Sequence, residues 1–181
     1  MNKPNIDDKS SKYFKYRDFI ECSSTYRNTP VNNIPDQSET FLSIKRLSEN
    51  LLDKIQDKFG KITLTYGFCG NQLQKKIKKG IYPKLDQHSG SELDKNGKLI
   101  CNRKGFAVDF YIEDECSLKI SRWITEYCLF DRIYFYGKKK PIHISLNDAP
   151  IQKITLMEFK NIKKVPKNIS KVAFLNTEID F

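Results

Sequence analysis

The chain has 181 residues, of which 39% are hydrophobic and 12% aromatic. That is enough apolar surface for a packed core and excludes wholesale disorder. The formal net charge is +10, which favours contact with anionic partners without establishing it. No run of 18 apolar residues and no secretory signal occur, so we expect no membrane span and a cytoplasmic location, with release by a phage-type lysis system as the alternative.

The five cysteines are odd in number, and no two of them form a CxxC pair. A zinc site made of four cysteines needs paired spacings, so this sequence does not predict one. We expect reduced thiols.

Polar and charged residues dominate positions 1–12, which we expect to be disordered. The segment 38–60 follows a long polar loop and predicts a helix, with Ser38 or Thr40 as the cap and Gly60 as the end. Its apolar residues recur at spacings of three and four: Phe41, Ile44, Leu47, Leu51, Leu52, Ile55 and Phe59. Residues 61–68 alternate apolar and polar side chains, which indicates a strand.

The second half begins with 71–80, a short basic segment that we expect to be helical. A polar loop leads to a strand at 105–112, a helix at 116–130 and a hairpin of strands at 131–137 and 141–146. The pattern predicts an α+β fold, an antiparallel sheet with helices packed on one side. We assign 13–146 to one domain and 147–181 to a basic C-terminal extension, which forms either one or two more strands or an appended tail.

The chain has only two histidines, His88 and His143, and each lies at or in an expected strand. Asp109 interrupts the otherwise apolar strand GFAVDFYI, where a lone carboxylate is costly to bury unless it is paired or binds a cation. Imidazole nitrogen and carboxylate oxygen are both zinc ligands. The sequence therefore predicts a zinc site formed by His88, Asp109 and His143, although each residue alone is more often structural.

Three short stretches resemble the zinc D-Ala-D-Ala carboxypeptidases and the zinc domain of Hedgehog proteins. They are Asp86-Gln87-His88, Gly105-Phe106-Ala107-Val108-Asp109 and Pro141-Ile142-His143-Ile144-Ser145, which resemble the family's S-x-H motif, its G-x-A-x-D motif and its last histidine strand. The resemblance spans about residues 36–146. It implies the Hedgehog/DD-peptidase fold, zinc as cofactor, and a zinc-bound water that attacks an amide carbonyl of a peptide or peptidoglycan-like substrate.

Three features depart from that family. The stretch 89–104 between the first two motifs is longer than the family normally has. The turn Tyr66-Gly67-Phe68-Cys69-Gly70 lacks the family's carboxylate-binding arginine. No acid directly precedes His143, where peptidase members carry a catalytic carboxylate.

Several residues are candidates for the remaining roles. Asp131 is the only acid in the stretch before His143 and is a candidate base, although a salt bridge at a helix-to-strand corner is the competing interpretation. Further acids near His88 in the sequence are Asp86, Glu92 and Asp94. Tyr134 is a candidate for stabilising an oxyanion, and Tyr66 and Tyr136 are candidates for substrate binding.

The sequence supports three functional hypotheses. The leading one is a zinc-dependent hydrolase of the peptidase or amidase type. The second is a zinc-binding module without catalysis, which the missing arginine and missing acid favour. The third is a metal-dependent protein that acts on nucleic acid through its lysine runs, at 75–79, 138–140 and 160–171.

Overall fold

The computed structural model describes residues 3–77, 87–160 and 163–181. Its helices are α1 (Tyr16–Glu21), α2 (Ser24–Asn28), α3 (Ser38–Leu47), η1 (Ser48–Leu52), α4 (Asp53–Phe59), α5 (Asn71–Gln74), η2 (Gln87–Ser89), α6 (Ser117–Tyr127) and α7 (Lys171–Asn176). Its strands are β1 (Ile62–Tyr66), β2 (Phe106–Ile112), β3 (Arg132–Phe135), β4 (Ile142–Leu146), β5 (Lys153–Lys160) and β6 (Lys163–Ile169).

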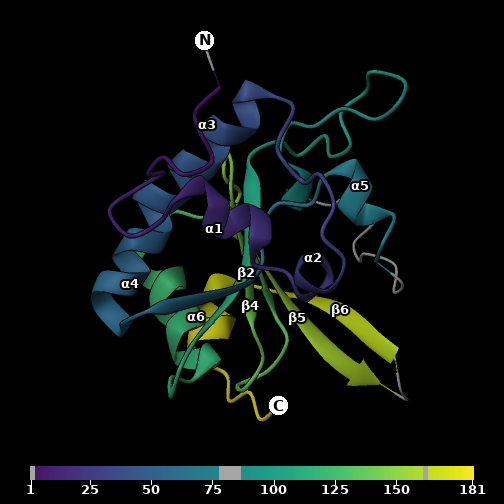
Figure 1. Cartoon of the computed structure of the whole chain (residues 1–181). Coiled ribbons are helices and arrows are strands. Elements are labelled where there is room, and N and C mark those ends of the chain that lie inside the picture. The colour runs from purple at the N-terminus through teal and green to yellow at the C-terminus, as the bar shows by residue number, and fades with distance from the viewer. Residues whose placement is uncertain (1–2, 78–86, 161–162) are drawn as a thin grey trace.

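The six strands form one mixed sheet in the order β1-β2-β4-β3-β5-β6. Figure 1 shows this sheet, with β2, β4, β5 and β6 labelled. The α+β class is therefore confirmed. The expectation of an antiparallel sheet is wrong at one place, because β3 and β5 run parallel, with Arg132 opposite Lys153. After β3 the chain forms the antiparallel strand β4 and then crosses to the other side of β3, where β5 runs in the same direction as β3. No helix within the described ranges is long and apolar enough to cross a membrane.

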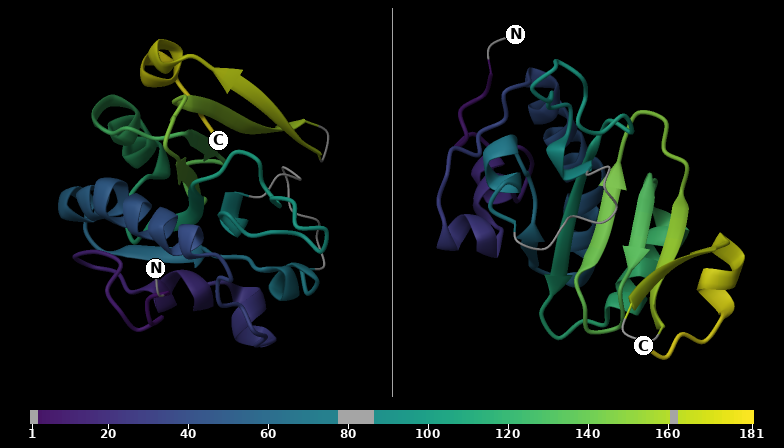
Figure 2. Two further views of the ribbon diagram at one scale, coloured as in Figure 1. Left: turned by 90° about the horizontal axis from the view of Figure 1, so that it is seen from above. Right: turned by 90° about the vertical axis from the view of Figure 1, so that its right-hand side faces the viewer.

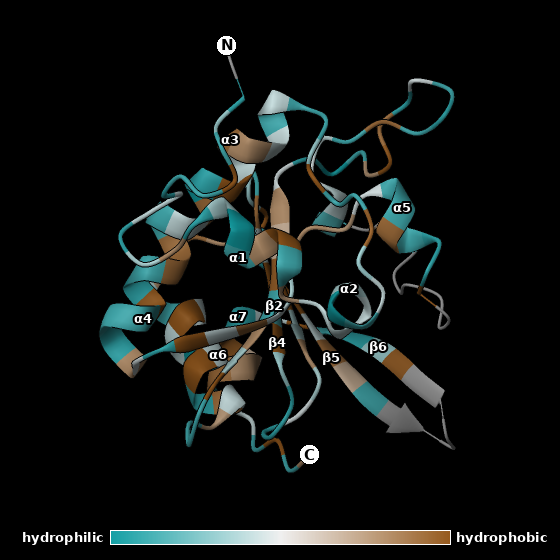
Figure 3. Ribbon diagram, viewed as in Figure 1, coloured by the Kyte–Doolittle hydropathy of each residue, from teal (hydrophilic) through white to brown (hydrophobic). Residues whose placement is uncertain are grey.

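The hydrophobic core lies between one face of the sheet and the longer helices. Alternate strand residues such as Val108, Phe110 and Ile144 point to that face and are fully buried. Helices α3, α4, α6 and α7 lie on this side, whereas the segment that follows η2 lies on the other (Figure 2, left). Hydrophobic residues concentrate in the central strands and on the inner sides of these helices (Figure 3).

The predicted helix at 38–60 is one continuous helical run made of α3, a π-helical turn (η1) and α4. It ends at Gly60, as expected, where φ is +98°. Its start differs from the prediction, because Gln37 is the N-cap and makes no side-chain capping bond. The Glu92 carboxylate supplies the acceptors instead, at 2.9 Å from the Asp36 nitrogen and 3.1 Å from the Gln37 nitrogen.

The described residues near both ends of the chain are integrated into the fold. Ser11 and Lys12, in the segment expected to be disordered, donate hydrogen bonds to the Asp53 carboxylate at 2.8 and 3.1 Å. At the other end, β5 and β6 extend the sheet and α7 contributes the buried Phe174 to the core. The expected helix at 71–80 appears as the shorter α5, and positions 78–80 lie outside the described residues.

Candidate metal centre

The second face of the sheet carries polar and aromatic side chains along one line of cross-strand partners. Tyr66 pairs with Asp109, Asp109 with His143, and His143 with Tyr134. Direct partners on the same face of adjacent strands have close Cβ atoms. The register of β1, β2, β4 and β3 therefore brings together residues that are far apart in the sequence.

His88 joins this line from η2, which contacts β2. Its Nε2 lies 3.2 Å from Nδ1 of His143 and 3.5 Å from Oδ1 of Asp109. Nδ1 of His143 lies 2.7 Å from the same Oδ1. Both imidazoles are buried, whereas the Asp109 side chain is 26% exposed, which leaves one side of the cluster accessible.

The other nitrogen of His88 fixes the orientation of its ring. Nδ1 lies 3.0 Å from the carbonyl oxygen of Gly67, which can only accept a hydrogen bond, so Nδ1 carries the proton. Nε2 of the neutral ring then presents a lone pair to Asp109 and His143. A backbone carbonyl bound to the distal ring nitrogen is the usual support of a metal-ligating histidine.

Backbone geometry at two glycines holds these elements close together. A Cβ at Gly67 would lie 2.3 Å from the carbonyl oxygen of Phe19. Gly105 has a φ of +70°, and a Cβ there would lie 2.2 Å from the carbonyl oxygen of Leu146. The small residue expected at Gly105 is therefore required by close backbone packing behind the cluster.

The donor set fits a tetrahedral metal ion. His88, Asp109 and His143 each offer a ligand atom, and these atoms all lie within 4.8 Å of one another. Zinc–ligand bonds of about 2.0–2.1 Å place tetrahedral ligands about 3.3 Å apart. The two distances from His88, 3.2 and 3.5 Å, agree with that spacing, and the third, 2.7 Å, is that of a hydrogen bond.

The electrostatics favour an ionised carboxylate at the cluster. Burial by itself raises the pKa of Asp109, but the interactions of its carboxylate with His143 and His88 outweigh it and hold the pKa well below its usual value. An anionic oxygen beside two imidazoles attracts a cation.

Two predicted tyrosines border the cluster. The Tyr66 ring lies edge-on to His88, with centroids 4.3 Å apart, and the Tyr134 ring lies edge-on to His143 at 4.9 Å. Tyr136 lies two residues beyond Tyr134, past the end of β3. The roles expected for these three tyrosines stay predictions.

Asp131 is buried and its carboxylate holds the scaffold. It accepts hydrogen bonds from Gln87 Nε2 at 3.0 Å and from the Ile151 nitrogen at 3.3 Å, and it lies 3.3 Å from Arg132 Nε. Because Gln87 directly precedes His88, these contacts position the turn that carries His88. The salt bridge considered for Asp131 is present, and its role as a base stays a prediction.

Of the other candidate acids, Glu92 and Asp94 do not join the cluster. Glu92 accepts hydrogen bonds from the backbone nitrogens at the start of α3. Asp94 accepts hydrogen bonds from the Asn96 and Lys98 nitrogens within its own exposed turn. Asp86 lies outside the described residues.

Sequence reasoning missed Arg103, which reaches the cluster through Tyr134. Its guanidinium donates to the Tyr134 hydroxyl at 3.3 Å. Among the residues that the structure describes, Arg103 has no carboxylate within ion-pair distance. Its place two residues before the G-x-A-x-D stretch was the only available signal.

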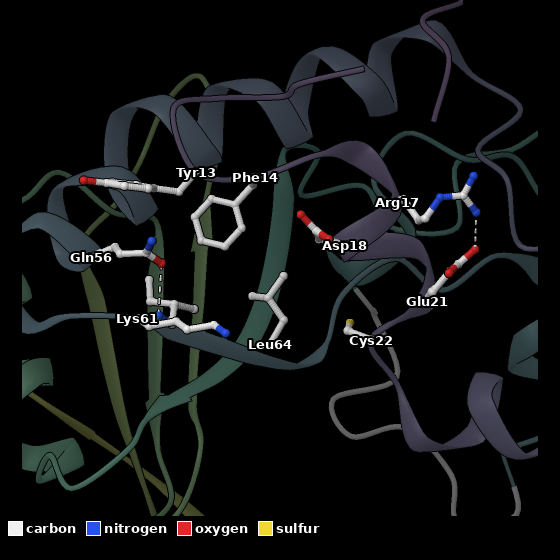
Figure 4. Close-up of a pocket in the computed structure, with 10 residues that line it drawn as sticks. Tyr13, Phe14, Arg17, Asp18, Glu21, Cys22, Gln56, Lys61 and Leu64 are labelled. Carbon is white, nitrogen blue, oxygen red and sulfur yellow. Dashed lines mark hydrogen bonds and ion pairs between the residues drawn. The ribbon is translucent and has the colours of Figure 1, made fainter. Parts of the chain in front are cut away.

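A pocket of about 470 Å³ lies elsewhere, between α1 and β1, and no residue of the cluster lines it (Figure 4). Its charged side chains include Arg17 and Glu21, which form an ion pair of 2.7 Å. The pocket therefore adds nothing to the metal centre.

Comparison with family models, curated proteins and solved structures finds no match to this chain. The interpretation of the cluster rests on its own geometry.

Proposed function

We propose that His88, Asp109 and His143 hold a zinc ion and that the protein is a zinc-dependent hydrolase of amide bonds. The observation that carries this proposal is the convergence of the only two histidines and one ionised carboxylate at a single point. A zinc ion with three protein ligands keeps a position for water and lowers the pKa of that water towards neutrality. The resemblance to the zinc D-Ala-D-Ala peptidases supports zinc and a peptide-like substrate.

The surrounding residues have distinct parts in this proposal. Gly67 fixes the ring of His88, and Asp131 fixes the turn before it through Gln87. Arg103 donates to the oxygen of the Tyr134 hydroxyl, so the phenolic hydrogen stays available. That hydroxyl can donate to the oxygen of a carbonyl bound beside His143 as negative charge develops on it.

The metal assignment is tested by zinc titration of the metal-stripped protein. We expect one zinc per chain with submicromolar affinity, and His143→Ala should weaken binding by at least about 100-fold, because one of three ligands is lost. Tyr127→Ala, on the exposed side of α6, is the matched control and should bind zinc as the wild type does. Equal zinc content in wild type and His143→Ala would show that the cluster is a hydrogen-bonded structural network.

A non-catalytic zinc module is the second candidate, and the contacts of Asp131 favour it. Its oxygens are occupied by Gln87, Ile151 and Arg132, which leaves it poorly placed to move a proton at the cluster. Turnover of a panel of peptides and muropeptides separates the two functions. Zinc-dependent cleavage that His143→Ala abolishes supports the hydrolase, and stoichiometric zinc without any turnover supports the module.

A further inference from the structure

A pocket of about 770 Å³ lies on the same sheet face as the metal centre. Two of its lining residues are near the cluster in sequence: Tyr111 stands two positions along β2 from Asp109, and Pro141 lies just before β4, two residues before His143. Residues two apart in a strand share a face and lie about 7 Å apart. The pocket therefore begins one side chain away from the cluster.

Thr65 connects the pocket to the metal centre. It lines the pocket and donates a hydrogen bond of 3.1 Å from its hydroxyl to the carbonyl oxygen of Asp109. The register shift between Leu64 and Tyr66 allows Thr65 and Tyr66 both to lie beside Asp109. Thr65 therefore places one wall of the pocket beside the backbone of Asp109.

The walls of the pocket are fixed by hydrogen bonds between the start of α6 and the loop between β3 and β4. The Ser117 nitrogen donates to the carbonyl oxygen of Lys138 at 2.9 Å, and its hydroxyl donates to that of Lys140 at 2.6 Å. These bonds hold the first turn of α6 against the loop between β3 and β4. The pocket is thus preformed, as ligand sites usually are, and its volume suits a small ligand.

The chemistry of the pocket differs between its floor and its rim. Tyr111 and Pro141 supply an aromatic and aliphatic floor. Glu113 and Asp114 stand at the rim together with Lys138 and Lys139, so both signs of charge are present there. An apolar side chain suits the floor, and the polar backbone of a peptide suits the rim.

We propose that this pocket is the specificity subsite of the hydrolase and takes a bulky apolar or aromatic side chain next to the amide bond cleaved at the cluster. The inference rests on the proposed zinc site and names the substrate class, a peptide-like chain with such a residue. Tyr111 and Pro141 contact the side chain, and the fixed walls set its distance from the metal centre.

The test compares two metal-binding probes on zinc-loaded protein by calorimetry. Acetohydroxamic acid reaches only the metal, whereas 3-phenylpropanohydroxamic acid also carries a phenyl ring over a distance that reaches the pocket. We expect the phenyl compound to bind about 10-fold tighter or more, because burying the apolar surface of an aromatic ring contributes at least that factor to the affinity.

Three variants test whether the tighter binding of the phenyl compound arises in this pocket. Cys116 is exposed and lines the pocket, so Cys116→Trp fills the pocket from its rim and should abolish the preference while acetohydroxamic acid binds as before. Tyr111→Ala removes the floor and should reduce the preference. Tyr127→Ala, remote from the pocket, should keep it, and thermal unfolding of each variant confirms that it is folded.

The outcomes separate this inference from the proposal beneath it. Equal affinity for the two probes in the wild type, or a preference that survives in folded Cys116→Trp, overturns the subsite. Failure of both probes to bind overturns the accessible zinc site itself, and the subsite with it.

Discussion

Asp109 and His143 are direct partners across β2 and β4, and Nδ1 of His143 lies 2.7 Å from Oδ1 of Asp109. The two residues are 34 positions apart in the sequence, so the pairing register alone brings them together. A shift of either strand by one residue would turn its side chain into the hydrophobic core. The contact between these two candidate metal ligands is therefore determined by the register of the central sheet.

Tyr134→Phe should separate metal binding from catalysis. The variant removes only the hydroxyl that accepts a hydrogen bond from Arg103, so we expect zinc affinity to stay within about 2-fold of the wild type. We expect kcat/KM to fall about 100-fold, which is the usual effect of losing one oxyanion donor. Zinc titration and peptide turnover measure the two quantities. Tyr127→Phe is the control, and an unchanged kcat/KM in Tyr134→Phe would remove its hydroxyl from the reaction.

Gly67→Ala should weaken zinc binding without altering a ligand. The added Cβ would lie 2.3 Å from the Phe19 carbonyl oxygen, so the Gly67 backbone must move. That movement strains the hydrogen bond that the Gly67 carbonyl oxygen accepts from His88. Loss of such support typically costs 10- to 100-fold in metal affinity, which competition with a chelator measures.

The control for Gly67→Ala is Gly97→Ala, in a turn where a Cβ meets nothing within 4 Å. Its φ of +74° makes alanine locally strained there too, so it reproduces a backbone penalty at a place remote from His88. Equal zinc affinity in Gly67→Ala and Gly97→Ala would show that the Gly67 carbonyl does not support the ligand.

Glu92→Ala should destabilise the fold and leave zinc binding intact. The buried carboxylate accepts hydrogen bonds from the Asp36 and Gln37 nitrogens and from the Thr40 hydroxyl at the start of α3. Removing a helix cap and leaving buried donors unsatisfied costs about 2 kcal/mol in the free energy of unfolding.

Denaturant unfolding measures that loss. Glu126→Ala, at an exposed position of α6, should change the free energy of unfolding by less than about 0.5 kcal/mol. A Glu92→Ala protein as stable as Glu126→Ala would contradict the capping role.

The thiols of Cys22 and Cys116 should react at very different rates. Burial raises the pKa of Cys22 to about 12, so at pH 8 only about one thiol in ten thousand is a thiolate. Cys116 is exposed. We expect iodoacetamide to modify Cys116 first and Cys22 slowly even at pH 9, with the sites identified by peptide mass mapping. A fast modification that persists in Cys116→Ser and maps to Cys22 would contradict this.

Local patterns in the sequence predicted the elements that are built from them. The spacing of apolar residues in 38–60 determined a helical run, because one face of a helix must be apolar to cover a sheet. The apolar run 105–112 predicted a strand that Asp109 interrupts, and the structure has this strand as β2. The structure then places Asp109 on the face opposite the core, since successive strand residues point to opposite sides. The scarcity of histidine then limited the ligands to His88, Asp109 and His143.

Only the tertiary structure decided how those elements meet. The parallel pairing of β3 with β5, the capping of α3 by Glu92, and the contact of Arg103 with Tyr134 join segments that are distant along the chain. A local pattern fixes which face a side chain takes but not which strand lies beside it. The sequence therefore determined which carboxylate and imidazoles are the candidate ligands. The sheet register decided that Asp109 and His143 meet, and the packing of η2 against β2 decided that His88 joins them.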